Sequence, residues 1–385
     1  MVLNDADQDV WSLGLDRIRC ALDRLGHPER SYKTVLVAGT NGKGSTCIFL
    51  ERMLVTSGLS VGTNLSPHVS KYIERFRLNS RCVLDQEILD LEHKIEPLLK
   101  DIHLTYFEWC VALACALFAR HDVDVGIFEI GLGGRFDAAN AIEPQVSIIT
   151  DISIDHIDYL GNTIDAITKE KVAIARPRRP LLTSAKGKAL HVIKEHALIT
   201  GAYLYEINTP VPYNTGINGQ HQTLNAALAL KAAEFLGVIL SRDDLCYALN
   251  TAFLPGRIES IGIRHTRIIL DVAHNPSSMV SLVKFLSKIG FKGVAVLGIL
   301  ADKDYMMMIS LLRYVCSKIY MAPVRSERSW QEHHMSEFIG LDGYYSMFNS
   351  IRQAFDVALA SGEDIVITGS FYSVAEVRDR IICQD

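Results

Sequence analysis

The sequence lacks any apolar run that approaches the roughly 20 residues a membrane-spanning helix needs, so a membrane protein is not expected. It also lacks a basic excess, because 44 Asp and Glu residues outweigh 39 Lys and Arg residues, and the basic residues are scattered. The basic stretch RPRRP, at 176–180, is too short to change that balance and is better explained as a solvated loop. The composition therefore argues against a nucleic acid or an anionic membrane as the main partner.

Cysteines in metal-binding spacing are also missing. Of the eight cysteines, the closest pair, Cys110 and Cys115, lies in an apolar stretch of helical character. Most of the eight are expected to be buried thiols, which suit a reducing compartment. The N-terminal stretch MVLNDADQDVW is acidic and polar, unlike a signal peptide. We therefore expect a cytoplasmic protein.

With 385 residues, the chain is too long for one hydrophobic core, so two domains are expected. Short β-rich runs alternate with helical patterns, and runs such as VSIIT and DIVIT are continuously apolar, as in parallel strands covered on both faces. This alternation predicts an α/β fold with right-handed crossovers. The predicted strands are 34–38, 124–130, 146–150, 181–184, 266–271, 293–298, 317–321 and 364–368. The predicted helices are 105–121, 220–236, 277–289 and 349–361.

A domain boundary is expected in the stretch FLPGRIESIGI, because Pro255 and Gly256 break the preceding helix and a new strand–helix series follows. The predicted division is 1–257 and 258–385. The first part is predicted to be a P-loop mononucleotide-binding domain with a mostly parallel sheet, and the second a smaller Rossmann-like α/β domain. A cleft between two such domains is a natural ligand site.

A glycine-rich turn with one lysine follows the first predicted strand, in TVLVAGTNGKGSTCIFL at 34–50. Its glycines let backbone N–H groups approach phosphate oxygens, and the helix that follows adds its partial positive charge. Lys43 would hold the β- and γ-phosphates, and Ser45 or Thr46 could reach Mg²⁺. A mere tight turn is the alternative. The residues expected to bind ATP here are Gly39, Thr40, Asn41, Gly42, Lys43, Gly44, Ser45 and Thr46.

Polar side chains also follow two further predicted strands. Glu129 ends one strand, and His156 comes just after another, flanked by Asp155 and Asp158. In doubly wound folds, functional sites gather at the carboxyl ends of the strands. A lone histidine there is more often structural, but three strand ends that carry polar groups together predict a site.

The turn GTNGKGST resembles the P-loop of the Mur ligase superfamily, most closely its folylpolyglutamate synthase/dihydrofolate synthase branch. The stretches SPHV…ERFRLN, TYFEW, EIGLGGRFDAAN, DHIDYLG, LPGRIE, ILDVAHNPSS, GILADKD and ITGSFYSVAEV are similar to motifs of that branch, in the same order, from about residue 13 to 377. The chain departs from the family pattern in EKVAI, where EKAGI is common, in FDAAN, where LDATN is common, and at Leu65, where a hydroxyl residue often stands.

The resemblance implies that Ser66, Glu129 and His156 ligate Mg²⁺, in part through ATP, with a monovalent cation as a further candidate. It implies that Lys171 is carbamylated, which suits a lysine among other cations with a lowered pKa. The alternative for Lys171 is an ordinary surface lysine, and the EKVAI departure lies beside it.

The resemblance further implies that Asn225 contacts adenine and that Asp271 contacts the ribose or its surroundings. Arg257 stands at the expected hinge between the domains, where it is well placed to touch phosphates when they close. It places L-glutamate at His274 and Ser370. Asp271 and Ser370 could instead be helix N-caps. The residues implied for a pterin are Leu15, Asp16, Thr105, Phe107, Asp137 and Ala138, and Phe107 could either stack on the pterin or belong to the core.

The reaction that the resemblance implies is ATP-dependent ligation of L-glutamate to a pterin carboxylate, dihydropteroate or a folate or both, through an acyl phosphate. The residues expected to act in it are Lys43, His156, Lys171 and His274. We expect a monomer that binds only small molecules. A Mur ligase of cell-wall synthesis is the first alternative, but it normally carries a UDP-binding domain for which no room is expected before Gly39. A non-catalytic nucleotide-binding regulator is the second, and it would be expected to have lost these ligands.

Overall fold

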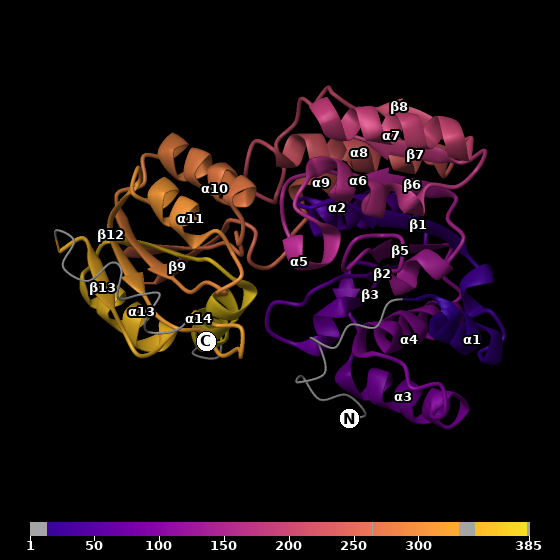
Figure 1. Cartoon of the computed structure of the whole chain (residues 1–385), viewed down its shortest axis with the longest axis horizontal. Helices are drawn as coiled ribbons and strands as arrows, with labels where there is room; N and C mark the ends of the chain where they lie inside the picture. The colour runs from indigo at the N-terminus through magenta and orange to yellow at the C-terminus, as the bar shows by residue number, and fades with distance from the viewer. Residues whose placement is uncertain (1–13, 264, 331–342, 383–385) are drawn as a thin grey trace. The chain divides into compact units, whose positions relative to one another are not determined.

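The computed structural model describes residues 14–263, 265–330 and 343–382 (Figure 1). The acidic stretch at the N-terminus, on which the expectation of no signal peptide rests, lies outside the described residues. The chain divides into two compact units, one drawn from 1–68, 72–216 and 222–252 and the other from 69–71, 217–221 and 253–385. No helix in the described ranges has the length and apolar character needed to cross a membrane.

The first unit is built on an eight-stranded sheet with the order β4-β3-β2-β5-β1-β6-β7-β8. Its strands are β1 (Lys33–Ala38), β2 (Val61–Asn64), β3 (Phe76–Leu78), β4 (Arg81–Cys82), β5 (Val125–Glu129), β6 (Val146–Ile149), β7 (Pro180–Thr183) and β8 (Tyr203–Glu206). Six neighbouring strands, β2, β5, β1, β6, β7 and β8, are parallel. Strands β3 and β4 are added antiparallel at the edge beside β2.

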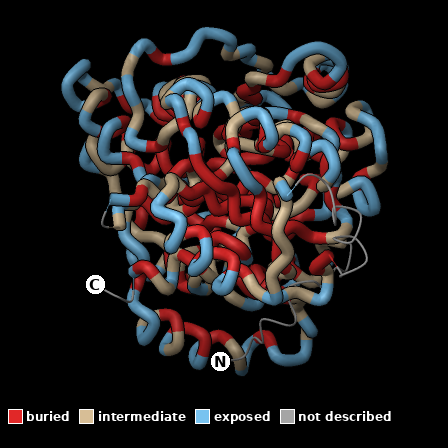
Figure 2. The backbone as a smooth tube through the Cα atoms, turned by 90° about the vertical axis from the view of Figure 1, so that its left-hand side faces the viewer, coloured by how far each residue is buried: buried red, intermediate tan, exposed pale blue. Residues whose placement is uncertain are grey.

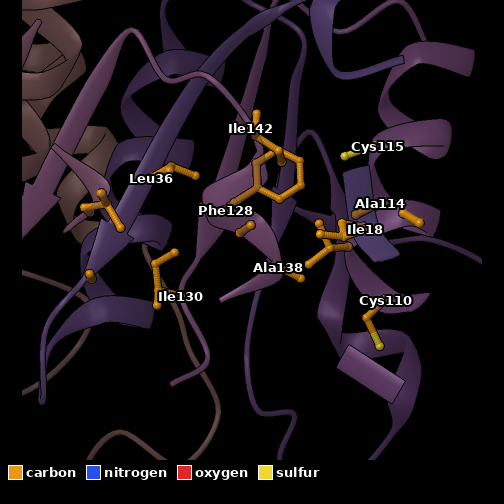
Figure 3. Packing of buried hydrophobic residues seen from close by; sticks show 14 of the residues in the cluster. Ile18, Leu36, Cys110, Ala114, Cys115, Phe128, Ile130, Ala138 and Ile142 are labelled. Atoms are coloured by element: carbon orange, nitrogen blue, oxygen red, sulfur yellow. The ribbon is translucent and has the colours of Figure 1, made fainter. Parts of the chain in front are cut away.

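The helices of the first unit are α1 (Asp16–Arg24), α2 (Lys43–Thr56), α3 (Asp85–Leu99), α4 (Tyr106–Arg120), α5 (Ile157–Leu160), α6 (Ile164–Lys171), α7 (Gly187–Thr200), α8 (Gln222–Phe235) and α9 (Arg242–Asn250). Short 3₁₀ turns lie at η2 (Pro28–Arg30), η3 (Tyr72–Arg75), η4 (Ala138–Ala141) and η5 (Val172–Ile174). Helix α4 is apolar almost all round and correspondingly buried. Figure 3 shows its Ala114 and Cys115 within the cluster that also contains Ile18 and Phe128.

The second unit is built on a six-stranded sheet with the order β13-β12-β11-β14-β10-β9, in which only β9 is antiparallel to its neighbour. Its strands are β9 (Glu259–Ile263), β10 (Thr266–Leu270), β11 (Gly293–Leu297), β12 (Cys316–Met321), β13 (Tyr345–Met347) and β14 (Asp364–Thr368). Its helices are α10 (Pro276–Lys288), α11 (Tyr305–Leu312), α13 (Ile351–Ala360) and α14 (Phe371–Ile382).

Alternate residues of the central strands of this second sheet belong to two different apolar clusters. Ile268 and Leu270 of β10 lie in one cluster, and Ile269 between them lies in the other. Because successive side chains of a strand point to opposite faces, each face of the sheet has its own core. Figure 2 colours the backbone by this burial, with buried residues in red.

The predicted fold class is confirmed, because two α/β units with mostly parallel sheets are present. All eight predicted strands and all four predicted helices exist, with ends shifted by at most two residues. The prediction left out the short or polar strands β2, β3, β4, β8, β9 and β13. The predicted division after residue 257 stays a prediction.

Candidate active site

Three neighbouring parallel strands of the first unit end at one edge of the sheet. Strand β1 lies between β5 and β6, with Val37 opposite Glu129 and Ala38 opposite Ile149. The glycine-rich turn follows β1, Glu129 is the last residue of β5, and His156 follows β6 in the chain. The three predicted strand-end groups therefore start from the same edge of one sheet.

The glycine-rich turn is held in a single conformation by the segment after β6. Gly39 has φ +144°, and a Cβ there would lie 1.9 Å from Thr150 Oγ1, so no other residue fits. Thr40 N–H donates to Asp151 O at 2.6 Å, and the Thr150 hydroxyl donates to Asn41 O at 2.7 Å. These contacts make the turn rigid and are compatible with both predictions, a phosphate cradle and a mere tight turn.

Helix α2 begins directly after this turn. Its N-cap is Gly42, so no side chain satisfies its first backbone N–H groups, and these are the groups that bind anions at a helix N-terminus. The Lys43 ammonium donates to Thr40 O at 3.2 Å, which holds the charge over the turn. The Thr46 hydroxyl donates to Gly42 O at 2.9 Å, and Ser45 is almost fully buried beside it.

Ser66 and Glu129 are brought together. The backbone N–H of Ser66 donates to Glu129 Oε2 at 2.9 Å. This hydrogen bond brings residue 66, which carries a hydroxyl, next to the Glu129 carboxylate. Hard oxygen donors of this kind are the ligands that Mg²⁺ prefers. In the described ranges, no group of three or more His, Cys, Asp or Glu side chains could hold a metal ion. A magnesium ion there would need ligands of other kinds, such as a serine hydroxyl and nucleotide phosphates.

Arg75 supports Ser66, although no role at the site was predicted for it. It is 4% exposed, and its Nη1 donates to Ser66 Oγ at 3.4 Å while its Nε donates to His68 Nδ1 at 2.9 Å. Burial and, to a smaller extent, the neighbouring Arg75 charge lower the pKa of His68 to about 3, so the imidazole is neutral and can accept this hydrogen bond. The ERF stretch could have suggested Arg75, but its contact partner could not be known.

His156 lies in the left-handed backbone region, with φ 52° and ψ 43°, at the N-cap of α5. Its N–H donates to Asp155 Oδ1 at 2.9 Å. A non-glycine residue in this conformation is uncommon and costs on the order of 1 kcal/mol, which marks the segment as constrained.

Lys171 ends α6 and is 5% exposed, so the alternative of a surface lysine is wrong. Burial lowers its pKa to about 7, and the Lys43 ammonium lowers it as well, against the opposite effect of Asp155 and Asp137. The turn that contains Gly134 packs on its backbone, because a Cβ at Gly134 would lie 2.8 Å from Lys171 O. Lys171 is therefore a buried lysine whose pKa is lowered, and it lies close enough to Lys43 of the glycine-rich turn to be affected by its charge.

Asp137 organises the turn after β5. Its Oδ2 accepts hydrogen bonds from the N–H groups of Gly131 and Leu132, at 2.9 and 3.1 Å, and its Oδ1 accepts one from Ala139 N–H at 3.0 Å. Burial raises its pKa to about 7, although these donors act against the rise. A Cβ on Gly131 would lie 2.9 Å from Phe107 Cε2, so the Phe107 ring of α4 packs directly against this turn.

Five of the six predicted pterin residues are thereby linked. Phe107 lies against the turn of Asp137 and Ala138, and Thr105 caps the same helix, α4. Leu15 is half-buried against the same apolar cluster as Phe107, whereas the Asp16 side chain is fully exposed. Phe107 also packs on that core cluster, so both of its predicted roles fit its position.

Asn225 in α8 is 7% exposed and lies against the glycine-rich turn, where a Cβ on Gly42 would come within 2.7 Å of its Oδ1. Its Nδ2 donates to Gln222 Oε1 at 2.9 Å, which fixes the direction of the amide. Gln222 lies in the first turn of α8 with Asn225, where the sequence also suggested that polar groups could face a ligand.

In the second unit, Asp271 follows β10 and its carboxylate accepts hydrogen bonds from the N–H groups of Ile258 and Ala273, both at 2.9 Å. Burial raises its pKa to about 6, and the Arg257 guanidinium acts in the opposite direction. The alternative of a helix N-cap is wrong for Asp271, because Asn275 caps α10. It fits Ser370, whose Oγ accepts from Ser373 N–H at 3.1 Å in the first turn of α14.

Phe371, next to Ser370, joins two predicted site residues of this unit. The Arg257 guanidinium lies 5.1 Å from the centre of its ring, and the His274 ring lies 5.7 Å from it. His274 Nδ1 lies 2.8 Å from Val272 O, which fixes the imidazole. Phe371 was missed because an aromatic residue at the start of a helix gives no signal that separates it from core.

Comparisons with known proteins identify the families of the two halves of the chain. Residues 37–184 match the Mur ligase middle domain, and residues 256–371 match the Mur ligase glutamate ligase domain. The dihydrofolate synthase/folylpolyglutamate synthase of Escherichia coli (strain K12) is 34% identical over 406 aligned positions, which cover 98% of this chain and 94% of the relative.

Two solved structures are similar over almost their full length. E. coli FolC in complex with DHPP and ADP gives a TM-score of 0.89 at 32% identity, covering 98% of this chain and 95% of that one. A bifunctional folylpolyglutamate synthase/dihydrofolate synthase with Mn, AMPPNP and L-glutamate bound also gives 0.89 at 32% identity, covering 98% and 96%. The chain therefore belongs to the dihydrofolate synthase/folylpolyglutamate synthase family of Mur ligases.

Proposed function

We propose that this chain ligates L-glutamate to the carboxylate of a pterin compound, dihydropteroate or a folate or both, with cleavage of ATP to ADP and phosphate. The observation that carries the proposal lies in the first unit: the glycine-rich turn after β1, whose helix has no side-chain N-cap, stands beside β5, whose Glu129 binds Ser66, and buried Lys171 lies within electrostatic reach of Lys43. Relatives described as bound to ADP, AMPPNP, Mn, DHPP and L-glutamate support the same substrates.

The first step is phosphoryl transfer. An oxygen of the substrate carboxylate attacks the γ-phosphorus, the bond to the β–γ bridging oxygen breaks, and ADP leaves. The Lys43 ammonium and the N–H groups at the start of α2 stabilise the charge on the transferring group. Ser66, Glu129 and His156 would hold Mg²⁺ with the phosphates, and this ion supplies further charge neutralisation.

The second step is attack by the glutamate amine on the acyl phosphate carbon, after which the tetrahedral intermediate collapses and phosphate leaves. The amine must first lose a proton. Because Val272 O can only accept, His274 Nδ1 carries the hydrogen, and Nε2 of the neutral ring is then the nitrogen that can accept a proton. His274 is therefore a better candidate base than Asp271, whose carboxylate already accepts two backbone hydrogen bonds.

We further propose that Lys171 is carbamylated. Its neutral amine attacks the carbon of CO₂ and releases one proton, which converts a buried cation into an anion near Lys43. Burial of the lysine and its lowered pKa support this, because only the neutral amine reacts. Asn225, Arg257 and Asp271 are proposed to contact the nucleotide, and Ser370 with His274 to contact L-glutamate. The six pterin residues predicted from the sequence are proposed to contact the acid.

Residues 1–257 are proposed as the ATP-binding domain and 258–385 as the glutamate ligase domain, which the two matched domain families support. A cytoplasmic monomer that uses Mg²⁺, with a monovalent cation as a further candidate, completes the proposal.

The test is a product assay. Purified protein with ATP, Mg²⁺ and L-glutamate is offered dihydropteroate and tetrahydrofolate in separate reactions, and product masses are recorded. We expect a product heavier by one glutamyl residue with at least one acid, and ADP in equal amount. Absence of product with both acids, while ATP is hydrolysed or untouched, would refute the proposed function.

A further inference from the structure

Glu108 in the first turn of α4 is a buried carboxylate that the reaction above does not use. It is 4% exposed. Its Oε2 accepts hydrogen bonds from the N–H of Thr105 at 2.8 Å, from the hydroxyl of Thr105 at 3.0 Å and from Arg17 Nε at 3.0 Å. Arg17 Nη2 lies 2.9 Å from Oε1. A single carboxylate therefore joins the start of α4 to the start of α1, 91 residues away in the sequence.

Two of these contacts have a local explanation and two do not. Thr105 and Glu108 form a capping box, a device that satisfies backbone N–H groups at the start of a helix. A capping box works with Glu or Gln in this place and needs no arginine. The contact with Arg17 is therefore an additional interaction: a charge-assisted hydrogen bond from Nε to Oε2, with the ion-pair contact of Nη2 at Oε1 beside it.

The segments that this contact joins are those assigned to the pterin acid. Leu15 and Asp16 precede Arg17, Thr105 belongs to the capping box, and Phe107 precedes Glu108. Phe107 lies against Gly131, whose N–H donates to Asp137. The Arg17–Glu108 pair therefore fixes the N-terminus of α1 relative to residues on α4 and, through Phe107, relative to the turn after β5.

We propose that Glu108 and Arg17 are positioning residues for the acid substrate, which set the spacing of the two segments between which the pterin ring binds. This inference rests on the proposed function. The pair does not touch the reacting atoms, so its loss should weaken binding of the acid and leave the nucleotide and glutamate sites as they are.

The test compares Michaelis constants for three substrates in four variants. Glu108→Gln keeps the capping box and removes the charge that Arg17 contacts. Arg17→Met removes the guanidinium and keeps the carboxylate. We expect each to raise the KM for dihydropteroate, or for whichever acid the wild type uses, by about tenfold or more, with the KM for ATP and for L-glutamate changed less than about twofold. The double variant should resemble the single ones, because both remove the same contact.

Arg24→Met is the matched control. Arg24 lies at the other end of α1 and makes a similar two-nitrogen contact with Asp101, with Nη2 2.8 Å from Oδ2, but this pair is solvent-exposed and touches no pterin residue. We expect no change in any Michaelis constant for this variant. If Glu108→Gln does not fold, Arg17→Met and Arg17→Lys decide the matter, with Lys expected to restore part of the affinity for the acid.

An unchanged KM for the acid in Arg17→Met, or an equal rise for all three substrates, would overturn the positioning role. A wild-type protein that ligates glutamate to no pterin acid would instead refute the proposed function, so the two failures can be told apart.

Discussion

At the scale of single residues, each of the two units holds ionisable groups whose pKa values burial has moved toward neutrality. The pKa of Lys171 is lowered to about 7, and the pKa values of Asp137 and Asp271 are raised to about 7 and about 6. Groups with such values gather at functional sites because reactions at neutral pH need them there.

Lys43→Ala should abolish ATP-dependent ligation while the protein stays folded. The Lys43 side chain is half-buried over the glycine-rich turn and donates a hydrogen bond to Thr40 O, so we expect little packing to depend on it. We expect kcat to fall by about 10²-fold or more. Turnover measures the loss of ligation, and the thermal unfolding midpoint measures whether the protein stays folded. Unchanged turnover would contradict the phosphate role.

Lys171 should bind CO₂ with a pH dependence set by its amine. With a pKa of about 7, roughly half of the amine is neutral at pH 7, against less than about 10⁻³ for an ordinary lysine. Carbamate content at fixed CO₂ pressure, and ligase activity with it, should therefore fall as the pH falls through about 7. ¹³C NMR of the protein in ¹³C-bicarbonate detects the carbamate, with Lys171→Gln as the control. No resonance specific to the wild type would count against the carbamate.

Which residues could be predicted depended on whether their role is visible along the chain. Lys43, Glu129 and His156 stand at the ends of recognisable strands, so their common edge could be foreseen. Arg75, Glu108 and Phe371 act through partners that only the folded chain brings near. Arg17 and Glu108, for example, are 91 residues apart, and nothing local marks them as a pair.

At the scale of elements, the prediction succeeded for strands with a continuous apolar run and failed for short or polar ones. Most of these lie at or near the edges of the sheets, but the buried inner strand β2, with the sequence VGTN, was missed as well. Strand β8 is mostly exposed and β4 has only two residues, both exposed, so neither gives a continuous apolar run. The glycines of turns could be recognised in the sequence. The glycine in strand β2 that lets helix α4 approach closely could not.

The packing of α4 on β2 should be intolerant of added volume. A Cβ on Gly62 would lie 2.4 Å from Phe118 Cδ1, and the Phe118 ring also packs on Phe128 with centroids 5.4 Å apart. We expect Gly62→Ala to lower the free energy of unfolding by about 1–3 kcal/mol and Phe118→Ala by about 3–5 kcal/mol. Chemical denaturation measures both, with exposed Leu198→Ala as the control. A neutral Gly62→Ala would show that this contact is loose.

At the scale of the whole molecule, each compact unit is assembled from separate parts of the chain. The second unit includes 69–71 and 217–221 besides 253–385. Val69, which is almost fully buried, belongs to the same apolar cluster as Val272 and Val374. A boundary motif cannot predict such discontinuity. The segments 69–71 and 217–221, which belong to the second unit although they precede the boundary, are short and show no shift in composition.

Val69→Ala should therefore destabilise the second unit although the position lies early in the sequence. Two methyl groups leave a buried cluster, which costs about 1–2 kcal/mol. Hydrogen exchange should become faster in β10 and α14 and stay unchanged in β1 and α4. Faster exchange in the first unit alone would contradict the assignment of 69–71 to the second.

The central claim is that this chain activates a carboxylate as an acyl phosphate and transfers it to glutamate. The most direct measurement uses the accepted pterin acid with ¹⁸O in its carboxylate, together with ATP, Mg²⁺ and L-glutamate. The account predicts one ¹⁸O atom in each phosphate released, because the carboxylate oxygen that attacks the γ-phosphorus leaves with it. Phosphate without ¹⁸O, accompanied by amide product, would contradict it.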